Sequence, residues 1–90
     1  MNNQIAIQMD KIESIDFEFD TSFLIGYEAQ QRNYKIFYYN PSDLIINNGN
    51  VQANGYYLEL NSDKNNYFKY TSEKIIVDLE NFDFIFLRQD

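Results

Sequence analysis

The order of three segments near the start of the chain constrains the fold most. Residues 5–9, IAIQM, form a short apolar run that is typical of a buried strand. Residues 23–33 follow good capping residues and contain no proline, which predicts a helix with an asparagine at its C-terminal cap. Residues 35–39, KIFYY, are β-branched and aromatic, and they predict a second strand. A strand, a helix and a strand at this spacing form a parallel pair with a right-handed crossover.

The middle of the chain has a different pattern, with two turn signals. Asn48-Gly49 is the strongest two-residue hairpin signal, and it predicts that residues 44–47 and 50–53 pair as antiparallel strands. Asn54-Gly55 predicts a second turn. The segments that follow it, 56–60 and 67–70, alternate polar and apolar residues and predict further antiparallel ribbons.

The last segment, FIFLR at residues 84–88, is a dense apolar run with charges on both sides, typical of a central parallel strand. Residues 10–20 carry five acids and one base, and their apolar residues follow neither a helical nor a strand periodicity, which indicates a loop. We therefore expect an α/β fold with a parallel three-stranded core, one long helix and an antiparallel hairpin excursion. At 90 residues, we expect the chain to form one small domain at most.

The charge balance excludes several classes of function. Seven Lys and Arg against 14 Asp and Glu give a net charge of -7, which argues against nucleic-acid and anionic-membrane partners. Without cysteine or histidine, the chain forms no disulfide, no thiolate or imidazole metal site and no Ser-His or Cys-His pair, so carboxylate chemistry remains. The first residues lack the basic region of a signal peptide, and no window approaches a membrane span, so we expect the cytoplasm.

The carboxyl ends of the predicted parallel strands provide the candidate binding residues, because ligands bind there in open parallel sheets. Asp20, Thr21 and Ser22 begin the predicted helix on the same edge. Free backbone N–H groups and the positive end of the helix dipole favour an anionic ligand, such as the carboxylate of a small molecule. The simpler interpretation is that Asp20 and Ser22 cap the helix and bind nothing.

Charged residues at the strand ends allow two further interpretations. Arg88 leaves a predicted buried strand and could bind a carboxylate through two hydrogen bonds, or it could pair with Asp10 or Asp90 as a structural salt bridge. Asp10 and Asp90 together could form an acidic Mg²⁺ pocket. Solvated surface charges are the simpler interpretation for these two carboxylates.

Six segments in order resemble a known family: IAIQMD, IESID, DTSF, EAQQR, FYYNPSDL and FDFIFLRQD. Together, from Ile5 to Asp90, they resemble the N-terminal domain of bacterial, or prokaryotic-type, glutathione synthetase, in the ATP-grasp superfamily. The departures are Lys11, where the family usually has proline, Asn33, where it has glycine, and Glu18, where a basic residue is frequent. The resemblance implies a Rossmann-like pre-ATP-grasp domain.

The resemblance also implies a function for the intact enzyme. In this family γ-glutamylcysteine is ligated to glycine, and ATP phosphorylates the cysteinyl carboxylate before the glycine amine displaces phosphate. ATP and Mg²⁺ are then expected outside residues 1–90, with no cofactor and no catalytic residue in this chain, which we expect to stop before the ATP-grasp body. The substrate-binding candidates are Asp20, Thr21, Ser22, Arg88 and Asp90.

Two alternatives stay open on the sequence alone. The chain could be a free-standing α/β binding or regulatory module without catalysis. A weaker alternative is an acidic receiver-like domain that uses Asp10 with Mg²⁺. If the chain is instead the N-terminal domain of an ATP-grasp ligase, as the resemblance implies, we expect an uncovered apolar patch around Phe17, Phe19 and Tyr39 where the rest of the enzyme would pack. We expect this patch to promote a homo-oligomer.

Overall fold

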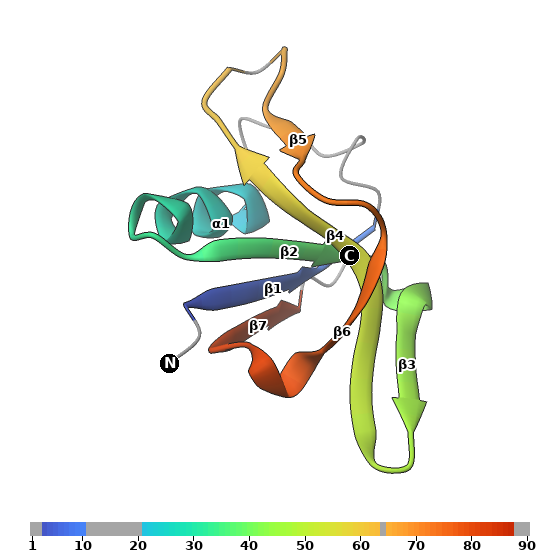
Figure 1. Ribbon diagram of the computed structural model, residues 1–90. Helices are drawn as coiled ribbons and strands as arrows, with labels where there is room; N and C mark the ends of the chain where they lie inside the picture. Colours follow the sequence, from blue (N-terminus) through green and yellow to red (C-terminus); the bar gives the residue numbers. More distant parts are fainter. Residues whose placement is uncertain (1–2, 11–20, 64, 88–90) are drawn as a thin grey trace.

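A computed structural model describes residues 3–10, 21–63 and 65–87. In these residues the protein is a mixed α/β fold, in which one helix packs on a curled mixed sheet (Figure 1). The elements in chain order are β1 (Gln4–Gln8), α1 (Thr21–Gln31), β2 (Lys35–Tyr39), β3 (Leu44–Asn47), β4 (Asn50–Leu60), β5 (Phe68–Tyr70), β6 (Ile75–Asp78) and β7 (Phe84–Leu87), with single 3₁₀ turns at Pro41–Asp43 and Leu79–Asn81.

Strand β1 lies between two parallel neighbours. Ile5 is the register partner of Ile36 in β2 and of Phe84 in β7. Because the sheet order is β3-β4-β2-β1-β7, strand β7 lies at its end, and the prediction that residues 84–88 form a central strand was wrong. Phe84 is 61% exposed, because no described strand covers the outer side of β7. An apolar run fits a half-covered strand as well as a central one.

Strand β4 is one continuous strand of 11 residues that pairs on both of its edges. In its second half, Leu58 pairs with Ile36 of β2 and with Tyr70 of β5. In its first half, Ala53 pairs with Leu44 of β3 and with Val77 of β6. The two halves of β4 therefore belong to two parts of the sheet that have different orientations. The sheet curls because this one strand continues from one part into the other (Figure 1).

The second turn predicted at Asn54-Gly55 is absent, because β4 runs straight through these residues. Gly55 serves a different purpose, where β4 passes from one part of the sheet to the other. A Cβ at this position would lie 2.1 Å from the carbonyl oxygen of Tyr38 and 2.9 Å from Cβ of Tyr39. The glycine is therefore needed for the close approach of two backbones, which is a second common reason for glycine inside a strand.

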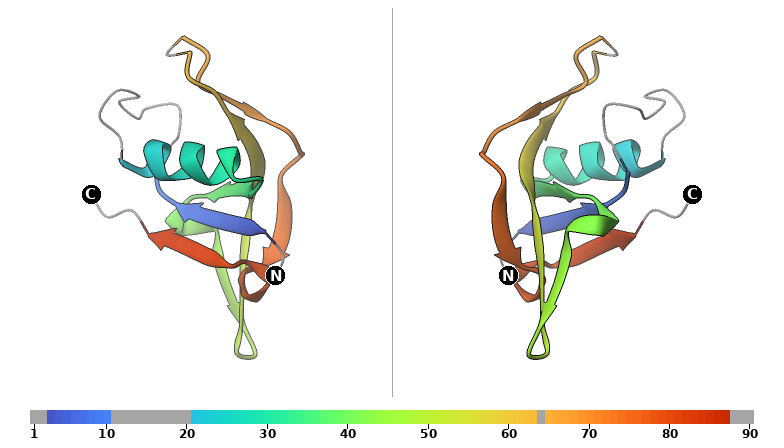
Figure 2. Two further views of the ribbon diagram at one scale, coloured as in Figure 1. Left: turned by 90° about the vertical axis from the view of Figure 1, so that its left-hand side faces the viewer. Right: turned by 90° about the vertical axis from the view of Figure 1, so that its right-hand side faces the viewer.

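The two faces of the sheet carry separate apolar clusters. The cluster under α1 includes Ile7, Phe23 and Leu60, and Figure 2 shows the helix lying along this face. The cluster on the opposite face includes Phe37 and Leu79 and is covered by β6 and the turn that follows it. Successive residues of a strand point to opposite faces, so the apolar runs in β1 and β2 fill both clusters.

Tyr39 belongs to the second cluster and is 1% exposed, so the expectation that it forms part of a bare surface was wrong. It lies inside because the curled half of the sheet folds over this face of β2. Phe17 and Phe19 lie outside the described residues.

The predicted turn and cap chemistry is confirmed at two places. Asn33 has a φ of 69°, the left-handed conformation expected of a C-terminal cap, and Tyr34 N donates to Ala29 O at 3.1 Å. Asn48 and Gly49 have φ values of 52° and 83°, as a type I′ hairpin requires. Local signals of this kind fix where elements begin and end.

Candidate functional site

The parallel strands end at one edge of the sheet, as expected for a binding edge. Gln8, the last residue of β1, is the register partner of Tyr39 in β2 and of Leu87 in β7. Helix α1 begins on this side, next to the arrowheads of β1 and β7 (Figure 2, left). The topology therefore brings together the strand ends and the helix start on which the sequence prediction depends.

The tyrosine Tyr38 holds two of these strand ends together. Its hydroxyl lies 3.3 Å from the backbone oxygen of Asp10 and 3.3 Å from Oδ1 of Asn40. The backbone N–H of Met9 donates to the oxygen of Tyr39 at 3.2 Å, which extends the pairing of β1 with β2 by one residue. The edge is thus an ordered surface at the ends of β1 and β2.

The predicted substrate residues are placed in part. Thr21 and Ser22 are the first residues of α1, so their backbone N–H groups belong to the first turn, where a helix leaves its donors free. Asp20, Arg88 and Asp90 lie outside the described residues, so neither the anion site at the helix start nor the pairing of Arg88 is tested.

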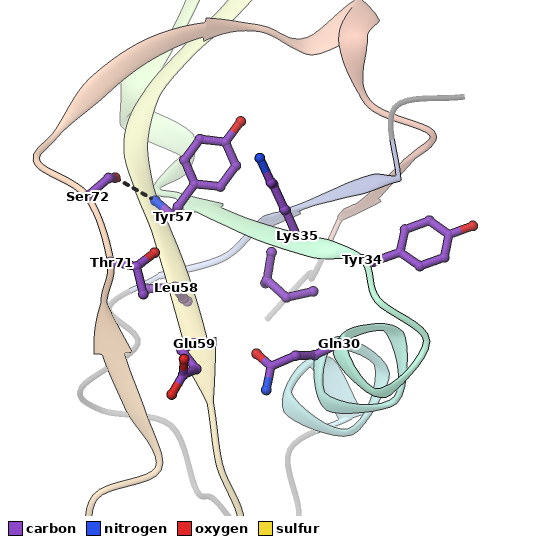
Figure 3. Close-up of a pocket in the computed structure, with 9 residues that line it drawn as sticks. Gln30, Tyr34, Lys35, Tyr57, Leu58, Glu59, Thr71 and Ser72 are labelled. Atoms are coloured by element: carbon purple, nitrogen blue, oxygen red, sulfur yellow. Dashed lines mark hydrogen bonds between the residues drawn. The ribbon is translucent and has the colours of Figure 1, made fainter.

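A groove of about 550 Å³ lies at the other end of these strands (Figure 3). Lys35, the first residue of β2, marks this end, and its side chain extends in the same direction as the Tyr57 ring. The groove is lined by residues from α1, the connection between α1 and β2, β2, β4 and the segment after β5: Gln30, Tyr34, Lys35, Ile36, Tyr57, Leu58, Glu59, Thr71 and Ser72.

Several polar groups of the groove wall hold its elements together. The Gln30 amide donates to Leu60 O at 2.6 Å and accepts from Leu60 N at 2.8 Å, so it joins α1 to the end of β4. Ser72 Oγ accepts from Tyr57 N at 3.0 Å and donates to Glu73 O at 2.9 Å. These groups are therefore used by the fold.

Two titratable side chains of the groove, Glu59 and Tyr57, are also engaged. Glu59 pairs with Lys69 across β4 and β5 at 3.6 Å, at the surface. The Tyr57 hydroxyl donates to the Gln4 side chain, and burial raises the pKa of Tyr57. Sequence reasoning missed this groove because its wall comes from separate segments of the chain, and no local sequence pattern signals such a combination.

Metal ligands do not gather in the described part of the chain. Among residues 3–10, 21–63 and 65–87, no group of three or more Asp and Glu residues is placed to hold a metal ion. Asp10 contributes its backbone oxygen to the contact with Tyr38, and its proposed Mg²⁺ partner Asp90 lies outside these residues. A separate observation is that no described helix has the length and apolarity to cross a membrane.

Comparisons with known proteins cover nearly the whole chain. The family model of the prokaryotic glutathione synthetase N-terminal domain matches residues 3–90. The chain is similar to the glutathione synthetase of Agrobacterium fabrum, at 41% identity over 86 residues, or 96% of this chain and 27% of that protein. It is also similar to that of Buchnera aphidicola, at 38% identity over 89 residues, or 99% of this chain and 28% of that protein.

A third relative extends the similarity to every residue. The glutathione synthetase of Mesorhizobium japonicum is 36% identical over 90 residues, or 100% of this chain and 28% of that protein. The chain thus spans just over a quarter of the length of these relatives. Because the family model matches from the first residues of β1 to the end of the chain, this protein belongs to the prokaryotic glutathione synthetase N-terminal domain family.

Proposed function

We propose that this chain is the N-terminal, substrate-side portion of a glutathione synthetase, which ligates γ-glutamylcysteine to glycine and converts ATP to ADP and phosphate. The observation that carries the proposal is the family match over residues 3–90. The three relatives named above, all glutathione synthetases, support it over 96–100% of the chain. A free-standing binding or regulatory module is not favoured, because these relatives align along the whole chain.

The finer fold assignment is part of the same proposal. A Rossmann-like pre-ATP-grasp domain is consistent with the parallel pairing of β2, β1 and β7 and with α1 as the crossover. ATP and Mg²⁺ would then be bound outside these 90 residues, and the chain would act in the cytoplasm, as expected from its sequence.

The substrate wall proposed here is the edge where β1, β2 and β7 end and α1 begins. Thr21 and Ser22 would offer the helix N-terminus to an anionic group, with Asp20 as the cap. Arg88, one residue after β7, would bind a substrate carboxylate, and Asp90 would complete the strand end. An acid and an arginine on one edge would favour an amino acid-like substrate over a simple anion.

A domain exchange tests the proposal. Residues 1–90 replace the aligned segment of the Agrobacterium fabrum enzyme, and glutathione formation from γ-glutamylcysteine, glycine and ATP is measured. We expect activity within about tenfold of the parent enzyme, a loss of about 1.4 kcal/mol of transition-state stabilisation at most. A folded chimera without glutathione formation would contradict the proposal.

The site assignment is tested within that chimera. Arg88→Ala should raise the KM for γ-glutamylcysteine or for glycine about tenfold or more, without raising the KM for ATP, because the arginine would bind a substrate carboxylate. Arg32→Ala is the matched control, since Arg32 pairs with Glu28 on the surface of α1 at 3.0 Å. Equal kinetics for the two variants would remove Arg88 from the site.

A further inference from the structure

The outer edge of β3 is an open strand edge. In the described part of the chain, β3 lies at one end of the sheet and pairs with β4 alone. Asn47 and Asn50 flank the two-residue turn and form a hydrogen-bonded pair, and bonded positions alternate along an antiparallel ladder. Ile45 therefore directs its backbone groups to β4, whereas Leu44 and Ile46 direct theirs outward.

This edge has no electrostatic protection. Residues 44–58 contain no charged side chain, although the whole chain carries 14 acids and a net charge of -7. Natural proteins usually protect an open edge with a lysine, another charge, a proline or a covering element. Strand β3 contains no lysine, no other charged residue and no proline. The β3 strands of two acidic copies of the chain can therefore approach each other without repulsion between charges on these strands.

The hairpin of β3 and β4 also has one apolar face. Ile46 is 73% exposed, Val51 is 42% exposed and Leu44 is 37% exposed, and all three share a face with the buried Ala53. The opposite face carries polar residues such as Gln52. The hairpin forms one end of a molecule that is 41 Å in its longest dimension, away from α1 (Figures 1 and 2).

We propose that β3 pairs in the antiparallel direction with β3 of a second copy of this chain, around a two-fold axis at Ile45. In this register Leu44 of each copy lies opposite Ile46 of the other. Both residues direct their backbone groups outward, so the two pairs form about four hydrogen bonds. The same register places the apolar faces of both hairpins side by side.

A second copy fits this edge better than an unrelated strand does. The two-fold register places an apolar residue opposite an apolar residue at positions 44, 45 and 46, and it places Asn47 opposite Asp43, so no two like charges face each other. A strand of four residues gives a small interface, so the dimer is weak and its population depends on protein concentration. This surface is separate from the proposed substrate edge, so the proposal does not depend on the ligase function.

Sedimentation equilibrium of the 90-residue chain tests the pairing. Ile46→Lys changes the net charge from -7 to -6, which lowers the overall repulsion between copies, so any loss of dimer comes from the edge itself. We expect its dimer dissociation constant to rise at least tenfold. Ile76→Lys makes the same charge change at a residue of β6 that is 57% exposed and points to the opposite face, and it should stay within about twofold of the unchanged chain.

A cross-link tests the register. The chain has no cysteine, so Ile45→Cys introduces a single thiol at the proposed axis, where the two side chains of a non-hydrogen-bonded pair come close enough for a disulfide. We expect rapid covalent dimer formation under mild oxidation and slow formation for Asn50→Cys on β4. A monomeric unchanged chain at about millimolar concentration, equal dimerisation of the two lysine variants, or equal cross-linking of the two cysteine variants would each overturn the proposal.

Discussion

Gly55 is the position in the curled sheet where we expect an added side chain to be most destabilising. An added Cβ would meet the carbonyl oxygen of Tyr38 at 2.1 Å, and backbone atoms cannot move aside as a flexible side chain can. We expect Gly55→Ala to lower the free energy of unfolding by about 3 kcal/mol or more, or to prevent folding. Urea unfolding followed by circular dichroism measures the loss.

Gly49→Ala is the matched control for this prediction. Gly49 has a φ of 83°, a left-handed backbone conformation that favours glycine, but no atom lies within 4 Å of the position of an added Cβ. The cost should be limited to backbone strain of about 1 kcal/mol. Similar losses for the two variants would mean that the contact with Tyr38 is not what requires the glycine at position 55.

Tyr39 makes stability depend on pH in the alkaline range. Burial raises the pKa of its hydroxyl above the ordinary value of about 10. Below that value the tyrosine is neutral in both states. Above it the unfolded chain loses the proton first and is stabilised, so the free energy of unfolding falls as the pH rises.

Tyr39→Phe should therefore reduce this alkaline loss. Among the described residues, the Tyr39 hydroxyl has no hydrogen-bond partner, so the variant should keep at least the stability of the unchanged chain near pH 7. Urea titrations at pH 8 and near pH 10.5 compare the two proteins. Parallel losses in both, or a variant weaker by more than about 1 kcal/mol at pH 8, would show that the buried hydroxyl does not act in this way.

At the scale of elements, Gln30 fixes helix α1 to the end of β4. Its amide makes both hydrogen bonds to the backbone of Leu60, at 2.6 and 2.8 Å. Gln30→Ala leaves two backbone groups partly buried and unbonded, so we expect a loss of about 1–3 kcal/mol. Hydrogen exchange of the Leu60 amide should accelerate, whereas Gln31→Ala, at an exposed position of the same helix, should leave that amide protected.

Local signals predicted most of the elements but not how they assemble. β2 has the predicted bounds because its composition and the Asn40-Pro41 turn act within a few residues. The Asn54-Gly55 prediction failed because the same dipeptide serves a turn or a close approach, and only the position of Tyr38 decides between them. β6, the strand Ile75–Asp78, was not predicted, because its role as the outer partner of β4 is a long-range property.

The edge at which the parallel strands end was predictable from the sequence, but the contacts along it were not. Parallel strands imply a shared carboxyl edge, and the registers of β1 with β2 and β7 place their ends there. The contact of Tyr38 with Asp10 and Asn40 depends on how far one side chain reaches across the edge, which no sequence pattern gives. The roles of Asp20, Arg88 and Asp90 stay predictions.

At the scale of the molecule, these 90 residues should not carry out the ligation alone. The sequence has three glycines and no glycine-rich loop with a neighbouring lysine that could hold a triphosphate. With ATP, γ-glutamylcysteine and glycine, phosphate release by the purified chain should equal the background without protein. Turnover above that background would move the ligase chemistry into this domain.

The parallel pairing of β1 with β7 joins segments that are far apart in the chain. Next to this pairing, Asp83 N donates to Gln4 O at 2.8 Å and Gln4 N donates to the Asp83 carboxylate at 3.2 Å, across 79 positions of the sequence. A ribosome makes Gln4 first, so β1 waits with one edge unpaired until residues 83–87 have emerged. Ordering a contact over so long a loop is entropically costly, which makes closure of this sheet a late and slow step of folding. Chaperones that hold extended strands would find β1 accessible for longer than any other part of the parallel sheet.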